Sequence, residues 1–447
     1  MKNYLMAIDA GTGSVRAVLF DLKGNQIGCS QHEWTHNEDP RFPGSMDFDW
    51  KYNWELASGC VRNVLAETKI DPAEIAAIST TCMREGILLY DKDGNEIWAC
   101  ANVDARSNDE VAELIRMNPD LELELYKKSG QSYALNAIPR ILWVKNNMPD
   151  IYEKTAKIGM FNDWLIYKLT GVLAVEPSNG STTGLLDLQT RTWDTEIAAK
   201  CNLRTDIFPD ILECGSISGK VTAKGASETG LAEGTPVVVG GGDCQLGTIG
   251  VGACKPGEAA VFGGSFWQYE FNTESGKTDP YGRVRVNCHA VPGVWQYEAL
   301  AFKPGLVMRW FRDGFCQEEK RKAKEIGDDP YNLMNQAAEK IPAGCYGMMC
   351  CFSDIMNFIN WKHAAPTFTN FELLPEKFNK YTFYRSILEN TAMLVKGHIE
   401  LVKEATGNMP SEIIFAGGAS KSPLWSQILA DVLGMPVRVP VVKEATA

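Results

Sequence analysis

The start of the chain joins two short apolar runs through a glycine-rich loop. The runs are residues 4–8 and 15–20, and the loop at residues 9–14 reads Asp-Ala-Gly-Thr-Gly-Ser. Because the second run is rich in β-branched and aromatic residues, the pattern predicts a strand, a loop and a second strand. A dinucleotide-binding fold needs a helix after its glycines and is therefore disfavoured. The nearest approach to a Walker A loop, residues 215–221, is one spacer short and lacks the final hydroxyl.

The loop at residues 9–14 could lie close to a polyphosphate. Glycine leaves the backbone N–H groups unobstructed, and the hydroxyls of Thr12 and Ser14 would add donors beside Gly13. A triphosphate would repel Asp9 unless Mg²⁺ lay between them, which makes Asp9 a candidate indirect metal ligand. Taken alone, the segment is explained better as an ordinary hairpin turn, and so its interpretation depends on the rest of the chain.

Length, charge and cysteine usage narrow the class of protein. A chain of 447 residues exceeds what one compact core holds, so we expect two domains, residues 1–255 and 256–447, that divide at a Pro-Gly turn. The net charge of −12 disfavours nucleic acid or an anionic membrane as a partner. The chain opens without the apolar core of a signal peptide, and its thirteen cysteines include no Cys-x-x-Cys pair. We therefore expect a cytoplasmic protein with reduced thiols.

The second half of the chain repeats the opening in outline. An apolar run at residues 259–262 leads into Gly263 and Gly264 and then into a strand-like run at residues 266–271. A long amphipathic pattern at residues 384–405, ended by Gly407, predicts a helix. Mixed strands and helices in both halves predict an α/β protein with two related lobes.

Asp243 follows an apolar run and three glycines. It would therefore lie at the carboxyl edge of a sheet, where open α/β folds bind their ligands. A lone carboxylate in such a crevice suits a general base that takes the proton from an attacking hydroxyl. A role as the N-cap of a following helix explains the same residue equally well.

Two further groups could contact ligands. The loop at residues 417–422 joins a predicted strand to a predicted helix, and Ser422 would be the N-cap of that helix. Its glycines could lie flat against a nucleotide, although a tight connection is the simpler explanation. Arg84 and Glu85, and then Asp104 and Arg106, stand at predicted strand ends, where charged pairs can hydrogen-bond a polyhydroxylated substrate. Taken singly, these pairs are more typical of exposed ion pairs.

Together, these segments resemble the FGGY carbohydrate kinases in the same order over nearly the whole chain. The matching segments are residues 9–16, 240–245, 262–266 and 415–434, which resemble the first phosphate loop, the catalytic loop, the second phosphate loop and the adenosine motif. The resemblance implies an α/β fold of two actin-like ATPase (ribonuclease H-like) lobes with a ligand cleft between them. It also implies ATP and Mg²⁺ as cofactors, Asp243 as the catalytic base, and Asp9 and Asp243 at the metal.

The same resemblance divides the remaining site residues between the nucleotide and a small sugar-like substrate. The residues implied at the nucleotide are Thr12, Gly13, Ser14, Arg16, Gly263, Gly264, Gly305, Arg309, Gly418 and Ser422. Those implied at the substrate hydroxyls are Arg84, Glu85, Asp104 and Gln245.

Within the family, residues 83–87 and 98–106 are most similar to kinases that phosphorylate an open-chain dihydroxy-pentanedione at its terminal hydroxyl. Many other relatives have Trp-x-Asp-x-Arg where residues 102–106 read Asn-Val-Asp-Ala-Arg, and residues 355–363 replace a usual glycine-rich segment. Both departures favour an atypical substrate, and we expect His363 to be structural or to line a pocket. The chain stops at Ala447, where relatives continue through a further helical stretch, so we expect either a truncated second lobe or one that finishes differently.

The mechanism implied is in-line phosphoryl transfer from ATP to a substrate hydroxyl, with Asp243 as the base. One alternative keeps this chemistry and changes the substrate to a ketopentose or polyol such as xylulose, ribulose or glycerol. A second alternative is a non-kinase actin-like ATPase that serves as a nucleotide-gated binding module. The pair Arg84 and Glu85 would have no evident purpose in such a module.

Overall fold

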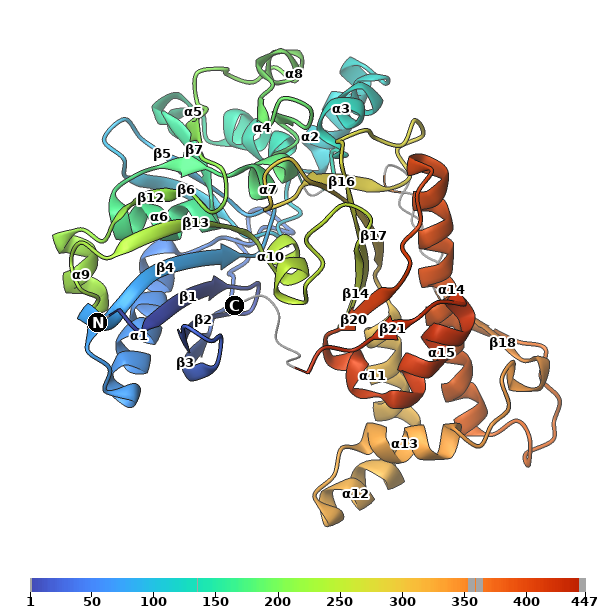
Figure 1. Cartoon of the computed structure of the whole chain (residues 1–447). Helices are drawn as coiled ribbons and strands as arrows, with labels where there is room; N and C mark the ends of the chain where they lie inside the picture. Colours follow the sequence, from blue (N-terminus) through green and yellow to red (C-terminus); the bar gives the residue numbers. More distant parts are fainter. Residues whose placement is uncertain (1, 135, 353–357, 359–364, 442–447) are drawn as a thin grey trace.

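The computed structural model describes residues 2–134, 136–352, 358 and 365–441, which form two lobes built on separate mixed sheets (Figure 1). Each of these sheets has six strands. Strands and helices are mixed in both lobes, which confirms the predicted α/β class. Among the helices that the structure describes, none is both long enough and apolar enough to cross a membrane.

The sheet of the first lobe is built on the hairpin predicted at the start of the chain. Its strands, in spatial order, are β12 (Ile217–Lys220), β13 (Pro236–Gly242), β4 (Ile75–Cys82), β1 (Tyr4–Ala10), β2 (Ser14–Asp21) and β3 (Gln26–Glu33). β1 is antiparallel to β2 and parallel to β4, and β4 is parallel to β13. The carboxyl ends of β1, β4 and β13 therefore meet at one edge of the sheet.

The sheet of the second lobe has the same plan. Its strands, in spatial order, are β16 (Arg285–Cys288), β17 (Trp295–Ala301), β15 (Trp267–Thr273), β14 (Ala259–Gly263), β20 (Ile413–Ala416) and β21 (Val437–Arg438). β14 is antiparallel to β15 and parallel to β20, just as β1 is antiparallel to β2 and parallel to β4. The predicted recurrence of the opening hairpin in the second half is confirmed.

Helices and short strands surround the two sheets. In the first lobe they are α1 (Trp50–Thr68), η1 (Pro72–Glu74), β5 (Ile87–Tyr90), β6 (Glu96–Cys100), α2 (Asn108–Met117), α3 (Leu121–Ser129), α4 (Ala137–Asn147), α5 (Pro149–Lys154), β7 (Lys157–Met160), α6 (Phe161–Thr170), β8 (Ala174–Val175), α7 (Pro177–Gly180), η2 (Ser181–Thr183), β9 (Leu186–Asp187), β10 (Thr192–Trp193), α8 (Thr195–Lys200), β11 (Asp210–Ile211), α9 (Ala223–Thr229) and α10 (Asp243–Gly250). In the second lobe they are α11 (Pro304–Phe315), α12 (Gln317–Ile326), α13 (Pro330–Ala338), η3 (Cys345–Gly347), β18 (Met349–Cys351), β19 (Thr367–Thr369), α14 (Lys380–Thr406), η4 (Gly418–Lys421) and α15 (Pro423–Leu433). The domain division predicted at residues 255 and 256 falls in the connection between α10 and β14, and it stays a prediction.

The two faces of β15 differ sharply in polarity. Trp267 and Phe271 are buried in the apolar core of the second lobe. Because side chains alternate across a strand, Gln268 and Glu270 lie on the opposite face. That face is turned to the first lobe, since Cys244 of α10 donates a hydrogen bond from its Sγ to Gln268 at 3.2 Å. The second sheet therefore has an apolar face toward its own helices and a polar face toward the other lobe.

The glycines before Asp243 allow β13 to lie unusually close to its neighbours. The pairing of β13 with β4 shifts register between Val238 and Gly241, which is the signature of a bulge. A Cβ placed on Gly240 would lie 1.6 Å from the carbonyl oxygen of Thr80 on β4. A side chain at this position would therefore push the two central strands apart.

We predict that Gly240→Ala lowers the free energy of unfolding by about 1–3 kcal/mol, as overpacking of a core does. The matched control is Gly314→Ala in α11, where a Cβ would meet no atom within 4 Å. That exchange should leave stability unchanged or raise it by about 0.5–1 kcal/mol, because alanine favours a helix interior. Urea unfolding measures both variants, and equal stabilities would contradict the close approach.

Candidate active site

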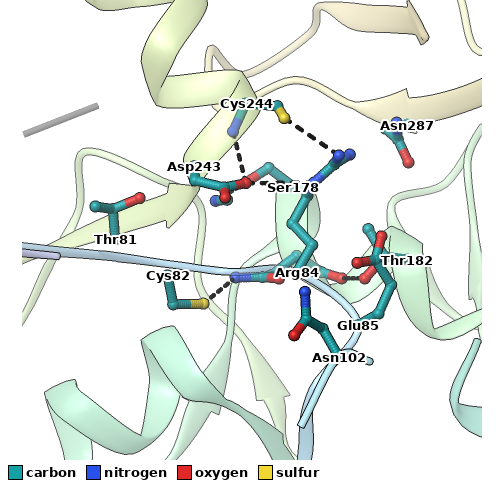
Figure 2. A network of polar contacts seen from close by, with 12 residues as sticks. Thr81, Cys82, Arg84, Glu85, Asn102, Ser178, Thr182, Asp243, Cys244 and Asn287 are labelled. Atoms are coloured by element: carbon teal, nitrogen blue, oxygen red, sulfur yellow. Dashed lines mark hydrogen bonds and ion pairs between the residues drawn. The ribbon is translucent and has the colours of Figure 1, made fainter. Parts of the chain in front are cut away.

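Asp243 begins α10 at the carboxyl end of β13, where the two lobes meet (Figures 1 and 2). Its carboxylate lies 3.5 Å from Nε of Arg84 and accepts a 2.8 Å hydrogen bond from the backbone N–H of Cys244. The side chain is 34% exposed, whereas that of Arg84 is 5% exposed. A helix does begin here, but its N-cap is Gly242 rather than Asp243. The aspartate carboxylate is therefore exposed on one side and paired on the other.

The protein around Asp243 makes its carboxylate more basic. Burial is the largest influence and raises the pKa of Asp243 to about 6. The Arg84 guanidinium acts in the opposite direction, and the negative charges of Glu85 and Asp9 raise this pKa further. A carboxylate with a pKa near 6 is ionised at pH 7 and is a stronger base than an ordinary aspartate. Asp243 can therefore accept a proton from a hydroxyl at neutral pH.

The predicted substrate pair, Arg84 and Glu85, lies buried at the junction of the two lobes. Arg84 forms an ion pair with Glu298 of β17 and donates to Sγ of Cys244 at 3.2 Å. Arg285 of β16 lies 2.6 Å from the Glu85 carboxylate and 3.3 Å from the Glu298 carboxylate. Each lobe therefore contributes one carboxylate and one guanidinium group to a buried cluster. The simpler expectation of exposed ion pairs is wrong for Arg84 and Glu85, and their contact with substrate stays a prediction.

Glu298 faces a second buried acid across the strand pair, because Glu270 of β15 lies directly opposite it. Burial alone would raise the pKa of Glu298, but the Arg84 and Arg285 guanidinium groups outweigh it and hold that pKa below its ordinary value. Burial, and then the charge of Glu298, raise the pKa of Glu270 well above its ordinary value. Of the two acids, Glu298 is therefore the one that gives up its proton more readily, and Glu270 is the one that holds its proton.

Sequence reasoning missed Glu298, Glu270 and Arg285. Glu270, Glu298 and Cys244 place three atoms that could bind a metal within 4.8 Å of one another. However, Arg84 donates to Cys244 and pairs with Glu298, so its guanidinium already supplies positive charge at this position. The only local signal is the alternation of polar residues along β15 and β17, which predicts a polar face without saying what it contacts.

The predicted first phosphate loop is the turn between β1 and β2. Asp9, near the end of β1, forms an ion pair with Arg16 of β2 at 2.9 Å. Gly13 faces open space, since no atom lies within 4 Å of the position that a Cβ would take. Thr12 and Ser14 flank it, with Thr12 exposed and Ser14 half-buried. The backbone of this turn is accessible to a ligand, and phosphate binding there stays a prediction.

The second lobe contains a cavity of about 370 Å³. All six residues predicted at the nucleotide in this half line it, namely Gly263, Gly264, Gly305, Arg309, Gly418 and Ser422. A Cβ on Gly305 would lie 2.1 Å from the carbonyl oxygen of Gly264, so the start of α11 lies directly against the second glycine loop. Ser422 is the N-cap of α15, as predicted. The rings of Tyr331 and Trp425 also line the cavity, which suits a planar base.

Three other residues that the sequence predicted at or near the site remain to be placed. Gln245 is buried in α10, and neither of its amide atoms has a hydrogen-bond partner in the part of the chain that the structure describes. Asp104 is fully buried, and its carboxylate accepts hydrogen bonds from the Arg106 guanidinium and, at 2.6 Å, from the Met46 N–H. Its predicted contact with substrate stays a prediction. His363 lies outside the described residues.

Two family models match the chain. The model of the N-terminal domain of the FGGY family of carbohydrate kinases matches residues 4–250. The model of the C-terminal domain of the same family matches residues 272–447. Both halves are therefore similar to this family, in the order that it has.

Curated relatives match the chain over its full length. The autoinducer-2 kinase of Yersinia enterocolitica is 52% identical over 446 residues, which cover 100% of this chain and 84% of that protein. The autoinducer-2 kinase of Yersinia pestis (strain Pestoides F) is 51% identical with the same coverage.

Solved structures match at lower identity. The xylulose kinase from Rhodospirillum rubrum has a TM-score of 0.86 at 22% identity, over 99% of this chain and 88% of that one. The Plasmodium falciparum glycerol kinase with ADP has a TM-score of 0.86 at 21% identity, over 100% of this chain and 87% of that one. At these identities the likeness shows the fold, and it confirms the predicted pair of actin-like lobes.

We predict that Glu298→Gln lowers the free energy of unfolding by about 3–5 kcal/mol, because it leaves Arg84 and Arg285 buried without their shared carboxylate. The matched control is Glu404→Gln, which breaks an ion pair with Arg283 whose acid is 65% exposed. That control should leave stability almost unchanged, since surface pairs contribute little. Urea unfolding measures both variants, and a Glu298→Gln protein as stable as the control would show that the buried cluster stabilises nothing.

Proposed function

This chain belongs to the FGGY family of carbohydrate kinases and is a phosphotransferase with an alcohol group as acceptor, and from this we propose that it phosphorylates the terminal hydroxyl of dihydroxy-pentanedione, the open-chain precursor of autoinducer-2. The observation that carries the proposal is the 52% identity to an autoinducer-2 kinase over the whole chain. Asn102, where many relatives have tryptophan, supports an atypical acceptor. The reaction would belong to the processing of a quorum-sensing signal.

We assign the role of general base to Asp243. Its carboxylate is exposed toward a ligand on one side, and its pKa of about 6 leaves it ionised at pH 7. In the proposed reaction it accepts the proton of the attacking hydroxyl as the oxygen forms its bond to the γ-phosphorus and the bond to ADP breaks. Arg84, 3.5 Å away, would hold the carboxylate in place.

Arg84, Glu85 and Gln245 would hold the acceptor. An alcohol both donates and accepts hydrogen bonds, and these side chains offer donors and acceptors together. Gln245 supports this assignment because its buried amide has no partner among the described residues, and an unpaired buried amide is destabilising until a ligand completes it. Asp104 is assigned a supporting role in the loop after β6, through its contacts with Arg106 and Met46.

The family implies ATP as the phosphoryl donor, and we propose that its adenosine occupies the cavity of the second lobe while its phosphates lie between Gly263 and the turn at Gly13. Asp9 and Asp243 would hold Mg²⁺. The donor set fits, since both are carboxylates, the ligands that this ion prefers. The charge of Asp9 also raises the pKa of Asp243, so the two acids act on each other. When bound, the ion neutralises charge on the phosphates. We also propose a cytoplasmic location.

ADP release measured with four alcohols tests the proposal: the dihydroxy-pentanedione, xylulose, ribulose and glycerol. We expect kcat/KM for the dihydroxy-pentanedione to exceed the others by about tenfold or more, because buried polar groups are left unpaired by the wrong acceptor. Asp243→Asn should lower turnover about 10²-fold while nucleotide binding survives. Asp206→Asn, which alters an aspartate that is 68% exposed, is the matched control and should keep full turnover.

Each other outcome has a defined meaning. Faster turnover of xylulose, ribulose or glycerol would identify a ketopentose or polyol kinase. ATP hydrolysis that is indifferent to every alcohol would identify a non-kinase actin-like ATPase. Full turnover by Asp243→Asn would remove Asp243 from the role of base.

The pKa of Asp243 predicts an acid limb in the pH profile. A base must be ionised, so kcat/KM should fall about tenfold per pH unit below the pKa of Asp243 and level off above it. We expect the limb at or below about pH 6, because burial raises this pKa to about 6 and a bound cation would lower it. Glu85→Gln removes a negative charge that raises this pKa, so the limb should move to lower pH. A limb that persists in the residual activity of Asp243→Asn would contradict the assignment.

A further inference from the structure

Arg140 is a fully buried arginine that the proposed reaction does not use. It lies in the first turn of α4 and is 2% exposed. In the part of the chain that the structure describes, its guanidinium pairs with no carboxylate, and its hydrogen bonds go to backbone carbonyl oxygens. Burying a guanidinium is unfavourable unless its donors are satisfied, and an apolar side chain would pack in a helix at lower cost. The carbonyls that it binds therefore account for its presence.

Those carbonyls belong to the two loops that carry the proposed substrate residues. One terminal nitrogen of Arg140 donates to the carbonyl of Glu85, in the loop after β4. The other donates to the carbonyls of Asn102 at 2.8 Å and Asp104 at 3.0 Å, in the loop after β6. A single planar group thus joins the two segments that lie just beyond the last pair of the β5–β6 ladder, Ile87 and Cys100.

The backbone at Glu85 needs such support. Its φ is +66°, in the left-handed region that residues other than glycine rarely adopt. In this conformation the carboxylate of Glu85 lies 2.6 Å from Arg285 of the second lobe. Because Arg140 binds the carbonyl of the same residue, it restrains the peptide that sets the direction of the side chain.

The other loop is linked to the predicted phosphate turn. The side-chain amide of Asn102 donates to Oγ1 of Thr12 at 3.0 Å. Its Oδ1 is buried and has no hydrogen-bond partner among the described residues. Asn102 therefore links the turn assigned to phosphate to the loop assigned to the acceptor.

We propose that Arg140 is a positioning residue that holds the loops of Glu85 and Asn102 at a fixed separation, so that both side chains face one acceptor molecule. The proposal rests on the function proposed above. The fork of a guanidinium has two terminal nitrogens in one plane and reaches the two loops from two points, whereas the three N–H donors of a lysine ammonium all leave from a single nitrogen. Reactions that depend on such alignment lose rate steeply when a loop shifts by about 1 Å.

Arg140→Lys tests this role, because it keeps the buried positive charge and removes the fork. We expect KM for the dihydroxy-pentanedione to rise about tenfold or more. KM for ATP should rise several-fold less, because Arg140 holds the substrate loops directly and reaches the phosphate turn through the hydrogen bond from Asn102 to Thr12. Arg204→Lys is the matched control, because Arg204 also donates from one nitrogen to two carbonyls, those of Tyr152 and Glu153, away from the site. It should change neither KM.

Hydrogen exchange provides a readout that does not depend on turnover. In Arg140→Lys, backbone amides at residues 84–87 and 101–106 should exchange at least several-fold faster, while those of the second lobe keep their rates. If Arg140→Lys does not fold, Arg140→Met removes the buried charge as well and is measured in the same way. Faster exchange at both loops supports the proposal.

Equal increases in both KM values, or unchanged exchange at the two loops, would overturn it and leave Arg140 a structural residue. A wild-type protein that phosphorylates none of the four alcohols would refute the proposed function instead. In that case exchange at residues 84–87 and 101–106 still decides whether Arg140 holds the two loops together.

Discussion

The buried cluster between the lobes is the interaction on which the candidate site depends. Arg84 and Glu85 come from the first lobe, Arg285 and Glu298 from the second, and each base lies against the acid of the other lobe. In a low-dielectric interior such charges are tolerated only when each one is paired. The cluster therefore fixes how the lobes meet, and through Arg84 it also fixes the carboxylate of Asp243.

Much of the architecture could be predicted from local patterns. The opening hairpin, its recurrence at β14 and β15, the long helix α14 and the serine cap of α15 each depend on neighbours within a few residues. A strand or a cap is determined by the chain around it, so the pattern contains the information. The residues that line the cavity of the second lobe could be named for a related reason, because their glycines mark places where the backbone must approach closely.

The partners of the charged residues could not be predicted in this way. Nothing near Arg84 in the sequence indicates that Glu298, more than two hundred residues later, neutralises it. The alternation along β17 predicts a polar face, but the contact depends on how two separately formed lobes meet. The contacts of Arg140 could not be predicted either, because its partners are backbone carbonyl oxygens, which every residue has. Asp104 matched a family position, yet its surroundings show a carboxylate engaged by Arg106 and Met46.

Each arginine of the buried cluster pairs with a carboxylate of the other lobe, and this pairing also limits which substitutions the protein can tolerate. Leu186 and Leu188 of the first lobe pack in the core of the second, but most of each apolar core comes from one lobe and can vary by small adjustments of its own packing. If a substitution at Arg84, Glu85, Arg285 or Glu298 removes a charge from one lobe, the oppositely charged partner in the other lobe stays buried without its partner. Substitutions there are tolerable only as matched pairs, one in each half of the gene, and the two halves must therefore evolve together.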